Sequence, residues 1–289
     1  MDLSEYDLVI TSCSSYIARG FKVGAKTKVM AYCHTPPRFL YGFETSIDWQ
    51  KHWPVRVYAT IVNHFLRLYD FWSAQRVDRW LVNSKNVAGR VEKCYRKESV
   101  VVYPPIEVEE LLNKGKETKK ENYFLIVSRL VGAKGLVEAA EAAAHLGFKL
   151  KIVGEAVGFS KVREKLEKME VELLGRVDDE QLRELYAKAK GFIALAKDED
   201  FGMTVVEAQA AGTPVLAYNG GGFRETILDG ETGVLISGIG VKEIEEGLKR
   251  FEKIKWSKEK IMTNAKRFEK AVFVEKIKEE VSKLMKENA

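Results

Sequence analysis

The sequence predicts an α/β protein built on doubly wound parallel sheets. Three observations lead to this prediction. Short apolar runs lack polar alternation, as is typical of strands buried on both faces, and helical segments separate these runs. The chain also has 289 residues with 46% hydrophobic content, which can bury one large core or two modest ones. We expect two domains.

In the first part of the chain, residues 1–105, the apolar runs predict strands at 7–13, 27–33, 79–83 and 99–103. A long aromatic helix is expected from about residue 54 to 75. Five of its apolar residues recur at three-to-four spacing, and we expect this face to pack in a core rather than to lie on a membrane. These residues are Val57, Ile61, Phe65, Leu68 and Trp72.

Residues 106–121 are charged and poor in apolar side chains, which predicts a linker or an exposed helix between domains. A second domain is expected at 122–256, followed by a helix-rich tail at 257–289. Strands and helices alternate through this domain, which favours a parallel sheet. The expected strands are 123–128, 149–153, 171–174, 191–196 and 214–218, and the expected helices are 135–146, 160–168, 179–189 and 203–211.

The segment EDFGMTVVE at 199–207 places two glutamates eight positions apart, where a strand turns into a helix. Glu199 is expected in the loop and Glu207 about one turn inside the helix. Ligands of open α/β sheets bind at the carboxyl ends of the strands, and a helix N-terminus offers free N–H donors and partial positive charge. The segment therefore suits a ligand with hydroxyls and phosphates.

This segment resembles the signature of the family 4 retaining glycosyltransferases, which use nucleotide-sugars and have the GT-B fold of two Rossmann-like domains. The likeness continues in FLIVSRLVGAKG at 124–135, KIVGE at 151–155, ELLGRVDDEQLRELYAKAKGFIALA at 172–196 and QAAGTPVLAYNGGGFRETILDGETGVLI at 209–236. Within the family, CHTPPRFLYG at 33–42, RVDRWLVNS and VVVYPPI are most similar to the mannosyltransferase-like group.

The resemblance implies an acceptor-side domain at 1–105, a nucleotide-sugar-binding domain at 122–256 and a tail that returns to the first domain. The family normally has about two further βα units before the equivalent of Asp7, on the order of 80 residues at about 30 residues per unit. We therefore expect a truncated N-terminal domain with an open strand edge. Self-association or a second chain that supplies the missing strands would cover it.

Arg129 and Lys134 flank the loop between strand 123–128 and helix 135–146, so both cations can converge on one phosphate pair. Two solvated surface cations are the alternative interpretation. The resemblance implies that they clamp the donor diphosphate, so that no metal and no other cofactor is required.

By the same resemblance, Glu207 accepts hydrogen bonds from the ribose hydroxyls and Glu199 contacts the transferred sugar. The backbone N–H groups of Phe201, Gly202 and Met203 would hold sugar or phosphate. Asp198 and Asp200 form an Asp-x-Asp pattern that chelates metal in another glycosyltransferase fold, a reading that the parallel-sheet context disfavours.

The backbone at Gly154, Arg176 and Val177 matches positions where the family contacts the donor and its base. Because the backbone makes these contacts, the side chains do not indicate whether the base is guanine, uracil or adenine. The turn at 220–222 could serve the ligand or only the fold.

His34 aligns with a His-x-Pro position that faces the donor in relatives, although a lone histidine is more often structural. The resemblance implies that it binds the transferring sugar or orients the acceptor. Arg38, one turn further along, could contact an acceptor phosphate.

Residues 1–105 hold 15 Lys and Arg against 9 Asp and Glu and contain 17 of the 30 aromatic residues. Such a surface can face anionic lipid head groups. No nucleic-acid-binding motif accompanies it. Neither a signal peptide nor a run of about 18 apolar residues is present, so we expect a cytoplasmic protein that can reach the inner membrane surface. The scattered Cys13, Cys33 and Cys94 predict buried thiols and no zinc site.

The leading hypothesis is a retaining hexosyltransferase that moves a hexose, with mannose from GDP-mannose as the first candidate, to a glycan, lipid-linked or small polar acceptor. A non-catalytic nucleotide-sugar-binding or scaffold subunit that needs a partner chain is the alternative. A sugar-nucleotide epimerase or a phosphorylase of the same architecture fits less well, because the glutamate spacing and the chain length disagree.

Overall fold

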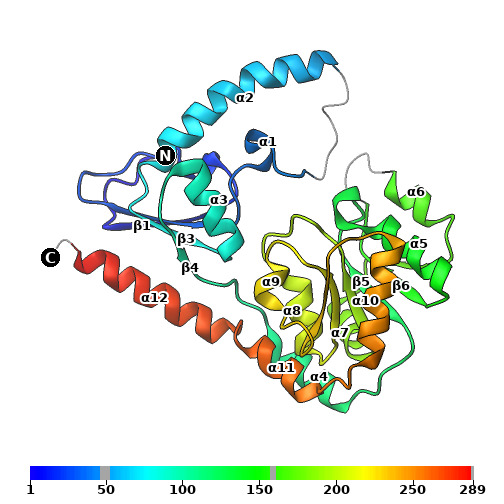
Figure 1. Cartoon of the computed structure of the whole chain (residues 1–289). Helices are drawn as coiled ribbons and strands as arrows, with labels where there is room; N and C mark the ends of the chain where they lie inside the picture. Colours follow the sequence, from blue (N-terminus) through cyan, green and yellow to red (C-terminus); the bar gives the residue numbers. More distant parts are fainter. Residues whose placement is uncertain (46–52, 157–160, 288–289) are drawn as a thin grey trace. The chain divides into compact units, whose positions relative to one another are not determined.

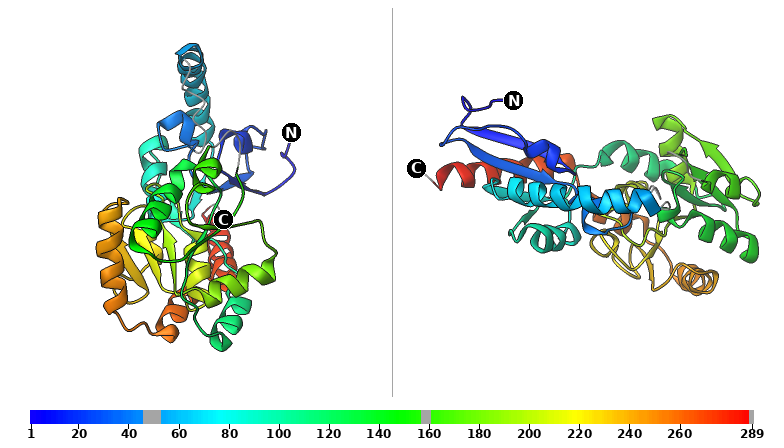
Figure 2. Two further views of the ribbon diagram at one scale, coloured as in Figure 1. Left: turned by 90° about the vertical axis from the view of Figure 1, so that its right-hand side faces the viewer. Right: turned by 90° about the horizontal axis from the view of Figure 1, so that it is seen from above.

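The protein is described by a computed structural model that covers residues 1–45, 53–156 and 161–287 (Figure 1). It separates into two compact units. Unit 1 comprises Met1–Pro104 together with Ala271–Ala289, and unit 2 comprises Pro105–Lys270. Figure 2 gives two further views of the same ribbon.

Unit 1 contains a four-stranded parallel sheet in the order β1-β2-β3-β4. Its strands are Leu8–Cys13, Lys28–Cys33, Arg79–Val82 and Val100–Val101. All four lie inside the predicted ranges. The central strands β2 and β3 are buried almost throughout, as their continuous apolar sequence requires.

The described part of unit 1 contains the helices η1 (Tyr16–Arg19), α1 (Arg38–Tyr41), α2 (Trp53–Ala74), α3 (Lys85–Tyr95) and α12 (Lys270–Lys286), whose first residue belongs to unit 2. Helix α3 begins at Ser84, whose hydroxyl accepts a hydrogen bond from the Val87 N–H. It packs on one side of β2 and β3 in a core that includes Val29, Trp80 and Tyr95.

The apolar face of α2 does not pack in a core, so that prediction is wrong. Its five residues are 46–68% exposed: Val57, Ile61, Phe65, Leu68 and Trp72. The buried side of the helix carries Ala59, Asn63, Asp70 and Ser73 instead. A buried ion pair between Asp70 and Arg19 of η1 holds this side inward.

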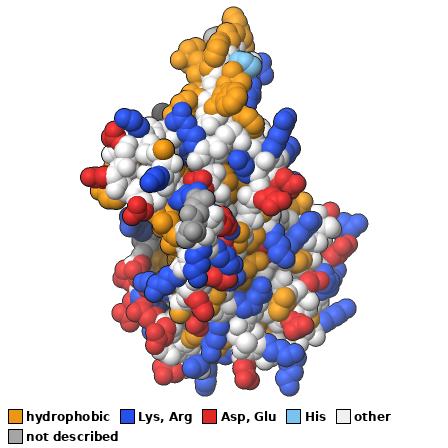
Figure 3. Space-filling view, turned by 90° about the vertical axis from the view of Figure 1, so that its left-hand side faces the viewer, with side chains coloured by type: hydrophobic (Ala, Val, Ile, Leu, Met, Phe, Trp, Pro, Cys, Tyr) orange, Lys and Arg blue, Asp and Glu red, His pale blue; other side chains and the backbone are white. Residues whose placement is uncertain are grey.

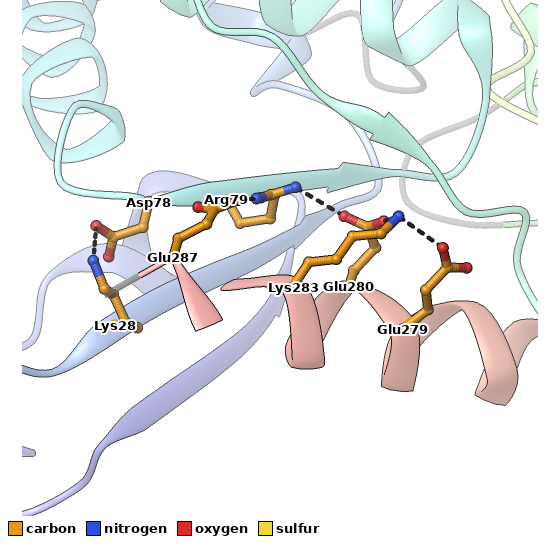
Figure 4. Close-up of polar contacts among 7 residues, drawn as sticks. All are labelled: Lys28, Asp78, Arg79, Glu279, Glu280, Lys283 and Glu287. Atoms are coloured by element: carbon orange, nitrogen blue, oxygen red, sulfur yellow. Dashed lines mark hydrogen bonds and ion pairs between the residues drawn. The ribbon is translucent and has the colours of Figure 1, made fainter. Parts of the chain in front are cut away.

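Helix α12 packs on the other side of the unit 1 sheet, where Phe273, Ile277, Val281 and Leu284 join the core around Met30 and Tyr32. Arg79 of β3 reaches Glu280 at 3.0 Å and also Glu287, while Lys283 pairs with Glu279 and Glu280 (Figure 4). At the edge of this view, Lys28 pairs with Asp78. The end of the predicted tail thus belongs to unit 1.

Unit 2 contains a six-stranded parallel sheet in the order β10-β9-β8-β5-β6-β7. The strands are Phe124–Val127, Leu150–Val153, Glu172–Gly175, Gly191–Ala194, Val215–Tyr218 and Gly233–Ile236 for β5 to β10. This order is the doubly wound arrangement that the alternation predicts. The last strand was not among the predicted ones.

Among the described residues of unit 2, helix α4 (Val108–Glu117) precedes these strands and the other helices lie between or after them. These others are η3 (Gly132–Lys134), α5 (Leu136–Leu146), α6 (Val162–Leu166), α7 (Asp179–Lys188), α8 (Met203–Ala210), α9 (Phe223–Thr226), α10 (Val241–Lys253) and α11 (Lys258–Lys266). The core contains Phe124, Leu136, Ile193 and Leu216 from the sheet and its covering helices.

Of the two alternatives predicted for 106–121, a linker or an exposed helix, the structure contains a helix, α4, but one of its faces is buried. Val108, Leu111, Leu112 and Gly115 of this helix are buried and share one face by their three-to-four spacing. The helix packs against α7 and α8. At Gly115 a Cβ would lie 2.7 Å from the Ala211 carbonyl oxygen, so the contact with the end of α8 is close.

Cys13, Cys33 and Cys94 are buried, as predicted, and form no disulfide. None of the described helices combines the length and the apolar character that a bilayer crossing requires.

Candidate active site

Strands β5 and β8 are neighbours at the centre of the unit 2 sheet, although two strands separate them in sequence. After β5 the chain continues to β6 and β7 on one side, and from β8 it continues to β9 and β10 on the other. The loops after β5 and β8 therefore start side by side at the carboxyl edge of the sheet and lead towards opposite ends of the strand order. Open α/β sheets bind ligands at this switch point.

Gly135 brings these two loops together. Its φ of +67° is in the left-handed region, and a Cβ there would lie 2.6 Å from the Cβ of Leu195 at the end of β8. The beginning of α5 consequently packs directly on the beginning of the β8 loop. Arg129 and Lys134 lie in the first of these loops and Glu199 in the second.

Lys134 and Glu199 form an ion pair, with 2.6 Å between Nζ and Oε2. Both side chains are mostly buried, at 25% and 21% exposure. Arg129 is exposed near the start of its loop. The sequence predicted each of these residues as part of one site, and the structure brings Lys134 and Glu199 into direct contact.

The turn at Gly220–Gly222 supports the backbone of the Glu199 loop. The N–H of Gly222 donates to the Glu199 carbonyl oxygen at 2.9 Å. A Cβ on Gly221 would lie 2.2 Å from that same oxygen, and its φ is +54°. Two roles were considered for this turn, ligand binding and support of the fold. These contacts establish its role in the fold.

Helix α8 begins directly after Gly202, whose φ is +93°. A Cβ at Gly202 would meet the Phe223 ring at 2.8 Å. Phe201 is buried against Phe268, whereas Met203 is 48% exposed. The first turn of α8 thus starts from a tightly packed loop close to Glu199 in sequence, and the Val205 N–H donates to the Gly202 carbonyl oxygen at 3.1 Å.

Glu207 lies one turn into α8, as predicted, and its Oε2 accepts a 2.7 Å hydrogen bond from the Tyr186 hydroxyl. Burial raises the pKa of Glu207, and the Tyr186 hydrogen bond opposes this rise. Burial also raises the pKa of Tyr186, so its hydroxyl remains a donor. Tyr186 was not predicted from the sequence, because its position in a helix does not indicate a partner on α8.

The three predicted base-side positions follow β6 and β7. Gly154 ends β6 with a φ of +139°, and a Cβ there would lie 1.9 Å from the Ser128 carbonyl oxygen. Its N–H donates to the Gly175 carbonyl at 2.8 Å, which links the ends of β6 and β7. Arg176 is exposed and Val177 half-buried directly after β7.

His34 and Arg38 belong to unit 1. His34 follows β2, and its Nε2 lies 2.9 Å from the Ser12 hydroxyl while its carbonyl oxygen accepts from Asn83. Arg38 opens α1, and its guanidinium donates to the Glu44 carbonyl oxygen at 2.9 Å. Both lie at the carboxyl end of the unit 1 sheet, as the sequence predicts for residues after β2.

Asp198 and Asp200 are half-buried in the β8 loop. Within the described ranges, no group of three or more His, Cys, Asp or Glu side chains is arranged to hold a metal ion.

Residues 107–268 match the family model of the glycosyl transferases group 1. The chain belongs to this family. The matched region spans nearly all of unit 2, including both loops of the switch point and helix α8.

Among curated relatives, the chain is 25% identical over 224 residues to an uncharacterized glycosyltransferase of Methanocaldococcus jannaschii. It is 24% identical over 278 residues to an alpha-1,3/1,6-mannosyltransferase of Dictyostelium discoideum. These alignments cover 76% and 80% of the chain. They cover 63% of each relative, so the chain spans less than two thirds of their length.

Two solved structures show the same fold. Sucrose-phosphate synthase from Thermosynechococcus elongatus has a TM-score of 0.73 at 16% identity, with 96% of this chain and 74% of that chain covered. Anabaena HepE in complex with UDP and glucose has a TM-score of 0.65 at 19% identity, covering 96% and 78%. The chain therefore has the GT-B type of α/β fold with parallel sheets.

Proposed function

We propose that this chain is a retaining hexosyltransferase that uses a nucleotide-diphosphate sugar without a metal ion. The observation that carries the proposal is the Lys134–Glu199 pair at the switch point of unit 2. The pair places two groups side by side: a cation that can bind a phosphate and a carboxylate that can bind sugar hydroxyls. The family supports transfer of a glycosyl group.

Retaining transfer breaks the anomeric C–O bond while negative charge grows on the departing diphosphate. We assign this charge to Arg129, Lys134 and the N-terminus of α8. Fixed positive groups in a partly buried loop stabilise such charge more strongly than water does. The same cations make a divalent metal unnecessary in this scheme.

Glu207 is assigned to the ribose hydroxyls, because a carboxylate can accept two hydroxyl donors at once. The Tyr186 hydrogen bond to Oε2 leaves Oε1 for such donors. The backbone at Phe201, Gly202 and Met203 would hold the sugar or phosphate. The backbone at Gly154, Arg176 and Val177 would contact the nucleoside.

In unit 1 we assign His34 to the transferred sugar and Arg38 to an acceptor phosphate, on the strength of the sequence motif alone. Mannose from GDP-mannose is the first donor to test, since one relative is named as a mannosyltransferase. The acceptor would be a glycan, a lipid-linked sugar or a small polar molecule. We place the reaction on the cytoplasmic side, at the membrane surface.

The deciding experiment is mass spectrometry of transfer products with a panel of nucleotide-sugars and acceptors, with and without any co-purifying protein. We expect one donor to give a product in which the anomeric configuration is retained. Binding of nucleotide without transfer under all conditions would favour the non-catalytic subunit instead. Inversion at the anomeric carbon would contradict the retaining assignment.

We also propose that the free edge of β1 pairs with another polypeptide strand. Strand β1 ends the unit 1 sheet, and its Ile10 is 51% exposed. An open edge presents unpaired N–H and C=O groups. Light scattering at tens of micromolar should therefore detect self-association or a co-purifying partner. A fully active, monodisperse monomer would contradict this proposal.

A further inference from the structure

Helix α2 of unit 1 carries a long exposed apolar face. Eight large side chains on it are 46–70% exposed: Trp53, Val57, Tyr58, Ile61, Phe65, Leu68, Tyr69 and Trp72. At 3.6 residues per turn these positions fall on one side of the helix. Figure 3 shows hydrophobic side chains gathered along this helix at the top of the molecule. Isolated exposed apolar residues are ordinary, but a contiguous face of this kind marks an interaction surface.

The orientation of α2 is fixed by polar groups on its opposite side. Asp70 is fully buried, pairs with Arg19 and accepts a 2.7 Å hydrogen bond from the Tyr41 hydroxyl. The Arg19 Nε donates to the Ser73 hydroxyl at 3.2 Å. Rotating α2 to bury its aromatic residues would expose this network and break the ion pair. The apolar face is therefore held outward by the packing of unit 1 itself.

Basic residues border one edge of the apolar face. Arg56 and Arg67 recur with Thr60 and Asn63 at three-to-four spacing, so all four lie along one flank of the helix. Together with Arg38 and α1 they line a cavity of about 430 Å³. Arg67 donates to the Leu40 carbonyl oxygen at 3.1 Å, which anchors α1 to this flank.

The only acidic residue of α2 is Asp70, which is buried in its ion pair. The exposed surface of the helix is thus aromatic and aliphatic on one side and basic on the adjoining flank. Helices that lie in the interface of anionic bilayers have this composition, because Trp and Tyr rings favour the head-group region and arginines pair with phosphates. A second copy of the chain would oppose one basic flank to another, which like charges disfavour.

We propose that unit 1 docks on an anionic lipid surface, with α2 lying in the bilayer interface and the cavity of Arg38, Arg56 and Arg67 taking a lipid phosphate. This docking depends on unit 1 alone and not on the nucleotide-sugar site of unit 2. Combined with the proposed function, it makes a lipid-linked molecule the acceptor that the enzyme meets.

Vesicle flotation of the full chain, without nucleotide, tests the docking. The vesicles contain phosphatidylcholine alone or mixed with phosphatidylglycerol. We expect binding to the mixed vesicles, with a blue shift of tryptophan fluorescence that Trp72→Phe diminishes. The combined variant Ile61→Ser, Phe65→Ser and Trp72→Ser should weaken binding at least about thirtyfold, since three interfacial side chains are lost. Arg56→Gln should weaken it about fivefold.

Matched controls use exposed residues of the same kinds elsewhere. Leu228→Ser removes an apolar side chain that is 43% exposed, and Lys242→Gln removes an exposed cation of α10. Both should leave vesicle binding unchanged. All variants alter exposed residues, and circular dichroism confirms that they fold.

Three outcomes would overturn the proposal: no binding to mixed vesicles by the unaltered chain, equal binding by the α2 triple variant, or equal binding to neutral vesicles. Oligomers that dissociate in the triple variant, without vesicle binding, would identify a second copy as the occupant. Calorimetry with nucleoside diphosphates on the same samples reports on unit 2, so that loss of the proposed function is distinguished from loss of docking.

Discussion

Lys134 Nζ and Glu199 Oε2 lie 2.6 Å apart, although they come from loops that follow different strands of the sheet. Their contact is an ion pair in which both side chains are mostly buried. In the proposed reaction, Lys134 turns to the diphosphate and Glu199 to the sugar. The pair thus holds both side chains in place until the donor separates them.

Replacing Glu199 by Gln should abolish transfer but not nucleotide binding. Lys134 loses its carboxylate partner and becomes available to the diphosphate, so nucleoside diphosphate affinity should rise about two- to fivefold, as expected for a modest ion pair. Calorimetry and product analysis measure the two effects.

His34→Ala should also abolish transfer while leaving nucleoside diphosphate affinity within a few-fold. Parallel loss of affinity and transfer in either variant would contradict assignment to the sugar.

Arg129→Ala should weaken nucleoside diphosphate binding at least about tenfold, because a charged hydrogen bond to phosphate contributes about 1.5 to 3 kcal/mol. Titration calorimetry in buffer with a metal chelator measures the change. Arg163→Ala, at an exposed arginine of α6, is the control and should leave affinity unchanged. Unchanged affinity in Arg129→Ala, or binding that needs magnesium, would disprove the clamp.

Nucleotide binding should depend on pH through Glu207. Ribose hydroxyls donate to the ionised carboxylate, and burial raises the pKa of Glu207, so affinity should fall on acidification at a higher pH than for an ordinary glutamate. Tyr186→Phe removes a hydrogen bond that lowers this pKa, so the fall should move to still higher pH. Calorimetry across pH measures it.

Glu207→Gln provides the reference for that series, since it retains only the titration of the nucleotide phosphates.

The folding stability should respond to pH in the opposite direction to the nucleotide affinity. A carboxyl with a raised pKa in the folded state binds protons more tightly there, so its contribution to stability falls as pH rises through that pKa. Glu207→Gln should remove this decline in urea denaturation. A decline that persists would show that another group causes it.

Asp70→Asn should destabilise unit 1 by about 3 to 5 kcal/mol, because it leaves the buried Arg19 guanidinium without a counter-charge. Urea denaturation followed by near-UV circular dichroism measures the loss. Asp2→Asn breaks the exposed pair with Lys22 and should change stability by less than about 0.5 kcal/mol. Similar stability of both variants would mean that the buried pair does not fix α2.

Gly221→Ala should lower the thermal midpoint by about 4 to 8 °C, since its Cβ would collide with the Glu199 carbonyl oxygen at a positive φ. It should also weaken donor use by displacing the Glu199 loop. Gly89→Ala, in the exposed middle of α3 with open space around it, should instead stabilise slightly. Scanning calorimetry compares the two, and equal midpoints would refute the collision.

The positions of the strands and helices were largely predictable. The predicted strands of both units contain β1 to β6, β8 and β9, because buried parallel strands are continuous apolar runs that can be recognised locally. The candidate site was predictable for the same reason. Arg129, Lys134 and Glu199 lie between a strand end and the next α-helix, Glu207 lies in the helix after β8, and strand ends of a parallel sheet meet at one edge.

By itself, the sequence determined the α/β class, the two sheets and the edge at which the site lies, since these depend on local periodicity and short motifs. Only the tertiary structure decided which face of α2 points outward, that α4 packs on unit 2 and that Tyr186 supports Glu207. The three-to-four spacing of apolar residues indicates that a helix has an apolar side, but it does not indicate what packs against that side. At α2 the buried Arg19–Asp70 pair, and not the apolar side, decides the orientation of the helix. An unpaired buried charge costs more free energy than exposed aromatic surface does.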